Sequence, residues 1–239
     1  ISSNEADFSG IWSTSYNTRL RANNLIDANV SPNTNVNQYK GEAYALRALT
    51  YFNLIRIYAR PYLADSTGLG VPIVLHYDPA YKPARSQTNQ VYARILNDLD
   101  SARILQTEYI NSTRFSPYAA TLLEAKVFLY MGNYKSALNL SLSVINNSGF
   151  TLLKGTDLLN YWADPSYHSQ TDQRETLFEV DADATLNISF NELACCYNQN
   201  SSGYLLANDS LYSLYSDTDY RKQLMTIGNR EQGESNAVL

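Results

Sequence analysis

Hydrophobic side chains recur at helical spacing along residues 41–60, and this stretch therefore predicts an α-helix. At 100° per residue, most of them fall in one stripe about 140° wide. The stripe contains Tyr44, Ala45, Ala48, Tyr51, Phe52, Ile55, Tyr58 and Ala59. The other side carries a second apolar set, Leu46, Leu49, Leu54 and Ile57, among polar residues. A helix on a single core needs only one stripe. The second set therefore predicts a helix packed between neighbouring helices, as in stacked helical repeats.

Helical periodicity also precedes and follows this segment. An N-terminal helix that contains Trp12 and Tyr16 is expected to end near Asp27, before a Ser-Pro pair. A helix over residues 88–105 is expected to begin at a cap formed by Thr88 or Asn89. Its solvent side is expected to carry two ion pairs at helical spacing, Arg94–Asp98 and Asp100–Arg103.

Residues 116–149 predict two helices joined by a very short turn. Ser116 is the expected cap and Pro117 takes the first helical position. Gly132 is expected to end that helix in a left-handed conformation, Asn133 to cap the next one, and Gly149 to end it. Helices joined by so short a turn must form an antiparallel hairpin.

The pattern changes after residue 149. Glu175–Ala182 predict a short strand whose Leu177 and Phe178 contact the core, and a short helix is expected around residues 210–215. Two long loops, residues 61–87 and 154–174, separate the regular elements. Loops of this length inside a compact domain are usually functional.

Composition narrows the function classes. The 239 residues carry a net charge of −5 and no basic run, which argues against a nucleic-acid surface. No apolar run approaches the roughly 20 residues of a membrane span. The chain begins with Ile1 rather than Met, and we therefore expect a processed chain or a fragment. The two cysteines, Cys195 and Cys196, are adjacent and cannot link distant segments.

Catalytic chemistry has little support. The two histidines, His76 and His168, lie in expected loops without the spacing of a metal site or a catalytic triad. Two acid pairs, Asp181/Asp183 and Asp217/Asp219, are interpreted as exposed acids of strand ends or turns, with a weak calcium site as the alternative. The sequence therefore predicts a protein that is not an enzyme and has no cofactor and no metal site.

The hairpin at residues 119–147 carries a tetratricopeptide pattern. The pattern consists of Ala125, Phe128, Gly132, Tyr134 and Ala137. An earlier copy is split: Ala48 and Tyr51 match Ala125 and Phe128, and the loop 61–87 displaces its second helix to residues 88–105. The predicted fold is mostly α, a tetratricopeptide-like helical scaffold (about 6–150) followed by a loop-rich part with a little β (about 151–239), all in a single domain.

Several motifs in this order resemble the SusD/RagB family. They are "LRANNLI", "GEAYALRALTYFNLIRIYARPY", "GVPIV", Arg85 before "TNQVYARILNDLDSA", "AKVFLYMGNYKSAL", "ETLFEV" and "LYSLYSDTDYR". Two features of the family are not found: the lipidated N-terminal cysteine, and the helical segment expected after Arg230. We therefore expect a SusD-like chain that lacks its C-terminal part, with an unusually small member as the alternative.

The resemblance implies a surface-exposed lipoprotein of the outer membrane that takes part in polysaccharide utilisation. Such a protein captures a glycan, without catalysis, as the lid of a SusC-like TonB-dependent transporter. Its membrane contact would be an N-terminal lipid anchor that this chain lacks, and no nucleic acid is expected as a partner. The alternatives are a peptide-binding member of the family and a helical-repeat adaptor between proteins.

Sugar binding needs flat aromatic faces beside hydrogen-bonding side chains. One long loop supplies Tyr62 and Asp65, and the other supplies Tyr161, Trp162 and Tyr167. The resemblance adds Arg47, which can reach toward the family's ligand face. The alternative for Arg47 is an ion pair or a hydrogen-bond clamp between helices, and for Tyr62 and Trp162 it is packing inside the protein.

Overall fold

A computed structural model describes residues 5–78, 80–163, 169–180, 197, 205, 207–227 and 237–238. The chain forms two compact units, one with residues 1–151 and 176–179, the other with residues 152–175 and 180–239. Each unit is considered by itself. The single-domain organisation expected from the sequence stays a prediction.

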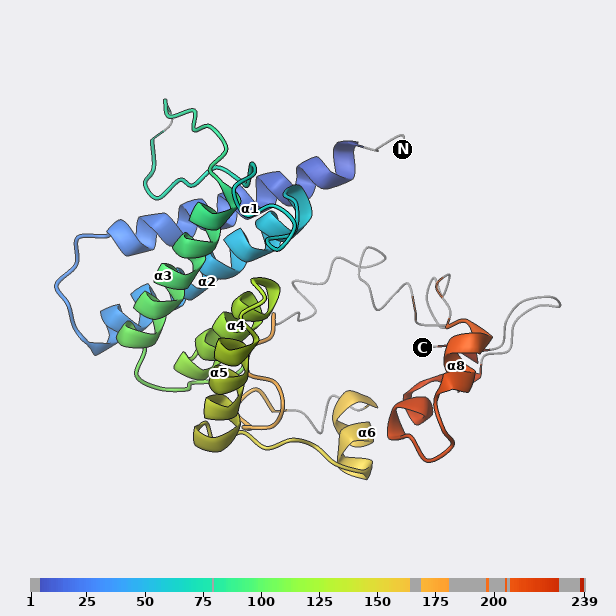
Figure 1. The fold of residues 1–239 in the computed structure, drawn as a ribbon. Coiled ribbons are helices and arrows are strands. Elements are labelled where there is room, and N and C mark those ends of the chain that lie inside the picture. Colours follow the sequence, from blue (N-terminus) through green and yellow to red (C-terminus); the bar gives the residue numbers. More distant parts are fainter. Residues whose placement is uncertain are drawn as a thin grey trace. The chain divides into compact units, whose positions relative to one another are not determined.

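The first unit is built from helices, as the sequence predicts (Figure 1). These are α1 (Glu5–Asp27), α2 (Thr34–Tyr58), α3 (Thr88–Leu105), α4 (Pro117–Tyr130) and α5 (Tyr134–Asn147). Each helix packs against the next one along the chain. This arrangement confirms a mostly α fold of stacked helices.

Helix α2 lies between α1 and α3, which confirms that it packs between neighbouring helices. Of its second apolar set, Leu54 is fully buried and Leu49 packs on the core, whereas Leu46 and Ile57 are exposed. Its side chains Tyr51, Phe52, Leu54 and Ile55 are fully buried and form the centre of the core. The helix begins at Thr34, earlier than predicted, because Asn33 caps it: the side chain of Asn33 accepts a hydrogen bond from the backbone N–H of Val36 at 2.9 Å.

The hairpin of α4 and α5 follows the predicted caps. Ser116 Oγ accepts a hydrogen bond from the N–H of Ala119 at 3.2 Å, and Asn133 Oδ1 accepts one from Ser136 at 3.2 Å. Gly132 has a φ of 76° and thus ends α4 in the left-handed region. These local signals confirm the antiparallel pair.

Helix α3 differs from the prediction at two places. Its cap is Gln87, whose N–H donates to Gln90 Oε1 at 3.0 Å, and not Thr88 or Asn89. The expectation that Arg94–Asp98 lies on the solvent side is wrong, since the side chain of Asp98 is fully buried. The reason is that this face of α3 packs against α2, from which Arg47 reaches the same carboxylate.

The predicted strand at Glu175–Ala182 is not found over residues 175–180, and residues 181–182 lie outside the described part of the chain. The predicted core contacts are confirmed, because Leu177 and Phe178 pack on the core and the ring of Phe178 stacks on Phe115 at 4.0 Å. A backbone hydrogen bond from Glu179 N–H to Ser112 C=O at 2.8 Å attaches the segment to the loop before α4.

The second unit contains short elements. They are α6 (Thr156–Ala163), α8 (Asp209–Leu214), the 3₁₀ turn η3 (Tyr220–Leu224) and the antiparallel strands β1 (Thr226–Ile227) and β2 (Ala237–Val238). Helix α8 confirms the predicted short helix. Helix α6 packs on η3, and Tyr212 and Tyr215 cover a small core of Ala207 and Met225. Within the described residues of either unit, every helix is too short or too polar to span a bilayer.

Candidate functional site

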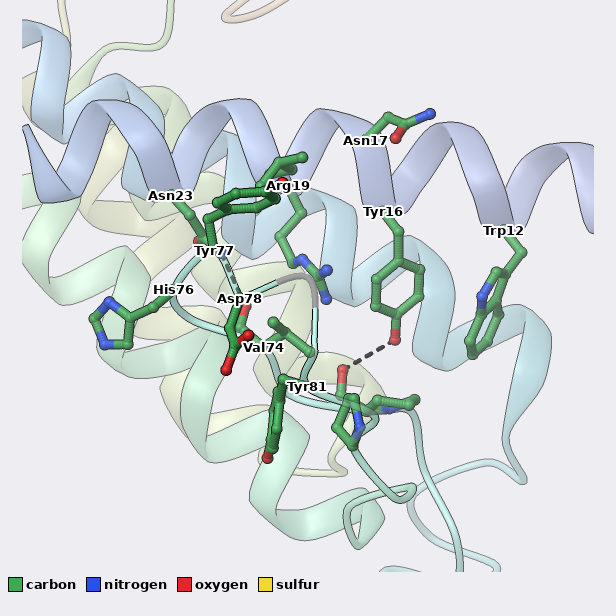
Figure 2. Close-up of a pocket in the computed structure, with 13 residues that line it drawn as sticks. Trp12, Tyr16, Asn17, Arg19, Asn23, Val74, His76, Tyr77, Asp78 and Tyr81 are labelled. Atoms are coloured by element: carbon green, nitrogen blue, oxygen red, sulfur yellow. Dashed lines mark hydrogen bonds between the residues drawn. The ribbon is translucent and has the colours of Figure 1, made fainter.

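Aromatic and polar side chains of the first unit line a hollow of about 400 Å³ between α1 and residues 72–78 and 80–83. We call this hollow the α1 groove (Figure 2). Its aromatic side chains are Trp12, Tyr16, Tyr77 and Tyr81. Its polar side chains are Asn17, Arg19, Asn23, His76 and Asp78.

The loop that forms one wall of the groove is closed where its two ends meet, at residues 70–71 and 85–86, and we call this closure the neck. The N–H of Gly70 donates to Ser86 C=O at 2.7 Å, and the N–H of Ser86 donates to Val71 C=O at 3.3 Å. Arg85 reinforces the neck, because its guanidinium donates to the carbonyls of Gly70, Leu69 and Tyr58 at 2.6, 3.0 and 2.7 Å. The carbonyl of Tyr58 is the last of α2, so the loop is fixed to the end of that helix.

Buried polar side chains hold the loop against the helices. The hydroxyl of Tyr51 accepts a hydrogen bond from the N–H of Val74 at 2.8 Å and donates one to its carbonyl at 3.0 Å. Asn23 Nδ2 donates to the same carbonyl at 3.0 Å, and the hydroxyl of Tyr16 donates to Pro72 C=O at 2.9 Å. Residues 72–74 are therefore attached to α1 and α2 at fixed points, and the wall of the groove is preorganised.

The aromatic side chains differ in their freedom. The ring of Trp12 lies 4.7 Å from that of Tyr16 and meets Tyr58 edge-on at 4.8 Å. Burial raises the pKa of the Tyr16 phenol, although Arg19 partly opposes that shift, so this hydroxyl stays protonated and donates at neutral pH. By contrast, Tyr77 and Tyr81 are 63% and 56% exposed. These two rings offer flat apolar faces to a ligand.

A buried arginine extends from α1 into the same space (Figure 2). The residue Arg19 is only 6% exposed, and its guanidinium lies 4.0 Å from the ring centre of Tyr16. Its Nη1 is 3.5 Å from the hydroxyl of Tyr51, at the limit of a hydrogen bond, and its Nε has no hydrogen-bond partner among the described residues. The groove thus contains a positive charge that has few polar partners among the described residues.

The rim carries acidic and basic groups that already have partners. His76 Nδ1 lies 2.8 Å from Asp27 Oδ2, and the side chain of Asp78 accepts a hydrogen bond from the N–H of Ala80 at 2.9 Å. Asp78 and His76 are nevertheless exposed, so they can also meet the hydroxyl groups of a bound molecule.

The structure places Arg47, expected at the ligand face, inside the protein. Its Nε and Nη2 donate to Asp98 at 2.8 and 2.7 Å, and its Nη1 donates to Asn23 at 3.0 Å. Burial alone lowers the pKa of Arg47, but the hydrogen bonds and charge of Asp98 raise it above its ordinary value. This geometry favours the alternative from the sequence, a clamp between helices.

Tyr62 and Asp65 lie in the first unit beyond the end of α2. The ring of Tyr62 is half-buried against Tyr92, with ring centres 4.8 Å apart. Asp65 lies 3.9 Å from Arg60 and lines a second hollow, of about 490 Å³, that also includes Arg85. Tyr62 therefore packs inside the protein, whereas Asp65 faces an open hollow with charged walls.

The remaining predicted residues belong to the second unit. Tyr161 in α6 is buried and its hydroxyl lies 3.4 Å from the carbonyl of Arg174. Its neighbour Trp162 is 58% exposed and meets the Tyr161 ring edge-on at 5.2 Å. Tyr167 lies outside the described residues. The structure thus brings Tyr161 and Trp162 together and leaves the Trp162 ring open to a ligand.

Sequence reasoning missed the α1 groove. It assigned Trp12 and Tyr16 to helix packing and did not single out Tyr77 or Tyr81. The available signal was the stretch "HYDPAYKP", residues 76–83, which gathers aromatic and charged side chains within a loop already expected to be functional from its length.

Comparison with known families agrees with the stacked helices. The sequence model of a SusD-like family, described as starch-binding and associating with the outer membrane, matches residues 1–129. The chain belongs to the SusD-like family. The resemblance inferred from the motifs is therefore confirmed.

Individual relatives cover a larger part of the chain. A SusD-like protein of Formosa agariphila is 30% identical over 146 residues, which are 59% of this chain and 27% of that protein. The crystal structure of a protein from Bacteroides vulgatus superposes with a TM-score of 0.84 at 26% identity, over 96% of this chain and 57% of that one. A laminarin-binding SusD-like protein superposes with a TM-score of 0.52 at 26% identity, over 65% of this chain and 34% of that one. The chain thus spans little more than half, or less, of the length of these relatives.

Proposed function

We propose that this SusD-like protein binds an oligosaccharide in the α1 groove and captures it for import. The observation that carries the proposal is the pairing of two exposed tyrosine rings, Tyr77 and Tyr81, with hydrogen-bonding side chains in one preorganised hollow. A laminarin-binding relative with the same type of fold supports a glycan as the ligand class.

The physical basis is the two-sided character of a sugar. The C–H face of a pyranose ring is apolar and packs on an aromatic ring, whereas its hydroxyl groups need donors and acceptors at the edge. In the α1 groove, Tyr77 and Tyr81 supply the faces, and Asn17, His76 and Asp78 supply the donors and acceptors. Because hydrogen bonds fix residues 72–74, this part of the wall loses little conformational entropy on binding.

The import role rests on the family. Its description includes association with the outer membrane, which supports a surface location and a SusC-like TonB-dependent transporter as partner. In this proposal the protein holds the glycan without breaking a bond and delivers it to the transporter. Co-purification with a SusC-like protein from the native membrane is the direct test of that step.

The binding proposal is tested by titration calorimetry with a panel of oligosaccharides and peptides. We expect Tyr77→Ala and Tyr81→Ala each to weaken glycan binding roughly tenfold, since each removes an aromatic face. The control is Tyr134→Ala, because Tyr134 is 63% exposed, as Tyr77 is, but lies outside the groove. Equal binding by the parent and both groove variants would rule out this site.

Variants of the residues expected from the sequence are titrated with the same panel of ligands. Trp162→Ala removes an exposed ring, and Asp65→Asn removes a carboxylate at an open hollow. Loss of binding in Trp162→Ala, with normal binding in Tyr77→Ala, would move the ligand site to α6. Tighter binding of peptides than of glycans would favour the peptide-binding alternative.

One observation favours a second role, that of a protein adaptor. Between α4 and α5 lies a hollow of about 440 Å³ with an apolar lining, of which Leu122, Leu129 and Leu138 are exposed. Exposed apolar surface of this kind suits a protein partner. If Leu138→Arg abolished co-purification with the transporter but kept glycan binding, the hollow would be assigned to protein docking.

A further inference from the structure

Arg19 is a buried cation for which no described residue supplies a counter-charge. Among the residues that the structure describes, Arg19 forms no ion pair, and its Nε lacks a hydrogen-bond partner. Its positive charge meets the ring of Tyr16 at 4.0 Å and the ring of Tyr51 at 5.9 Å. A cation–π contact offsets only part of the cost of removing a guanidinium from water.

A comparison with two other arginines indicates that the lack of a compensating group is particular to Arg19. Arg47 is equally buried, but Asp98 neutralises its charge through two hydrogen bonds. Arg21 lies on α1 two positions after Arg19 and is exposed, so water solvates it. Of these three, Arg19 alone has neither a carboxylate from the described part of the chain nor free access to water.

The surroundings of Arg19 lead to the α1 groove, which it lines (Figure 2). The nearby polar side chains Asn17 and Asn23 are neutral. The carboxylate of Asp78 lines the same hollow, but it forms no ion pair with Arg19 and instead accepts the N–H of Ala80. The guanidinium therefore remains available to a negative group that enters the hollow.

We propose that the α1 groove takes an acidic sugar and that Arg19 binds the carboxylate or sulfate of that sugar. This inference rests on the proposed glycan-binding function and narrows its substrate class. A planar guanidinium can hold a carboxylate or a sulfate through two parallel hydrogen bonds, which gives both charge neutralisation and orientation. Tyr77 and Tyr81 would cover the ring of the same residue.

A neutral glycan would use the site less well. Sugar hydroxyls can accept hydrogen bonds from Arg19 but leave its charge uncompensated. The free-energy cost of that buried charge is then the same in the complex as in the free protein. The 239-residue chain has a net charge of −5 and repels anions at long range. Preference for an acidic sugar therefore depends on the local contact with Arg19 and not on general electrostatic attraction.

The first experiment changes the ligand and leaves the protein intact. Oligomers of galacturonate, glucuronate and mannuronate are titrated beside their carboxyl-reduced, neutral counterparts, and sulfated galactan oligomers beside their desulfated forms. We expect at least one acidic form to bind roughly tenfold more tightly than its neutral partner, as charge-assisted hydrogen bonds imply. The two arms distinguish a carboxylate from a sulfate.

The second experiment changes Arg19. Arg19→Gln should abolish the preference for the acidic form and keep the binding of the neutral one, whereas Arg21→Gln should preserve the preference. Arg19→Lys keeps the charge but loses the planar fork, so it should show an intermediate preference. If Arg19→Gln does not fold, as judged by its thermal transition, the ligand pairs on the unaltered protein decide.

The outcomes separate the two proposals. Equal or tighter binding of the neutral forms in every pair overturns the acidic-sugar inference and leaves glycan binding standing. A preference that survives in Arg19→Gln also overturns it, because another group must then hold the anion. Failure of every glycan to bind overturns both proposals.

Discussion

Arg47 of α2 and Asp98 of α3 form a two-point ion pair, with their side chains only 4% and 0% exposed. The same carboxylate lies 2.9 Å from Arg94, and the remaining nitrogen of Arg47 donates to Asn23 of α1. This buried network therefore connects three helices through side chains that are far apart in the sequence. Removal of one charged partner should destabilise the fold, because a buried charge without a counter-charge has a high free energy.

Removing Asp98 should destabilise the fold strongly. In Asp98→Asn, Arg47 keeps its burial but loses its counter-charge, and we expect a loss of about 3–5 kcal/mol in the free energy of unfolding. The measurement is urea-induced unfolding followed by circular dichroism. Asp100→Asn is the control on the same helix, since Asp100 is exposed and its pair with Arg103 is worth about 0.5 kcal/mol. Similar losses in both variants would contradict the role of the buried network.

The hydroxyl of Tyr51 should control the order of the groove wall. Tyr51→Phe leaves the N–H of Val74 without its acceptor, and we expect a cost of about 1–3 kcal/mol. The distinctive readout is hydrogen exchange, in which the amide of Val74 should lose protection more than the amides of α4. Tyr134→Phe, at an exposed position, should change neither. Unchanged protection at Val74 would show that other contacts hold the loop.

Two glycines should respond to alanine with opposite signs. Gly132 has a φ of 76°, and a Cβ there would lie 2.8 Å from Leu63 Cδ2, so Gly132→Ala should cost about 1–2 kcal/mol. Gly10 lies within α1 with nothing within 4 Å of the added Cβ, so Gly10→Ala should stabilise by about 0.5–1 kcal/mol. Thermal unfolding of the two variants beside the parent checks both signs. A gain in Gly132→Ala would refute the left-handed turn.

Glu124 should make stability depend on pH. Burial raises the pKa of its carboxyl, although Arg103 partly opposes that shift. Because the folded pKa lies above the unfolded one, this group's stabilising contribution is complete below the unfolded pKa and is lost as the pH rises through the folded pKa. Glutamine does not ionise, so the Glu124→Gln variant does not lose this contribution. The free energy of unfolding of the variant, relative to that of the parent, should therefore increase from pH 4 to pH 7.

Urea unfolding at a series of pH values measures that difference. Glu108→Gln is the matched control, since Glu108 is exposed, and its difference from the parent should stay flat. A flat profile for Glu124→Gln as well would mean that Arg103 fully compensates the burial of the carboxyl.

Local signals explain which helices could be predicted. Ser116, Pro117 and Gly132 act on the backbone within a few residues of themselves, so the sequence around them was enough to place α4 and the turn after it. The first turns of α2 were missed because residues 34–40 are mostly polar and carry no apolar stripe. There the cap by Asn33 decides the boundary, together with packing against α1.

Non-local contacts explain what could not be predicted. The spacing of Arg94 and Asp98 is that of a surface pair, and only the arrival of Arg47 from another helix makes the site a buried one. The α1 groove is similar, since Tyr77 and Tyr81 lie in a loop without periodicity. Their place beside α1 depends on tertiary hydrogen bonds, such as those of Tyr51, that no local pattern indicates.

The neck formed by Arg85 has a consequence for how such proteins diversify. The two ends of the loop are tied to each other and to the last carbonyl of α2, and residues 72–74 are attached to α1 and α2. The stretch from residue 75 to residue 84 can therefore differ in length and sequence without displacing the helices. Insertions there would alter the shape of the cavity and leave the register of α2 and α3 unchanged. A graft of residues 75–84 from another member is thus a compact way to exchange ligand selectivity.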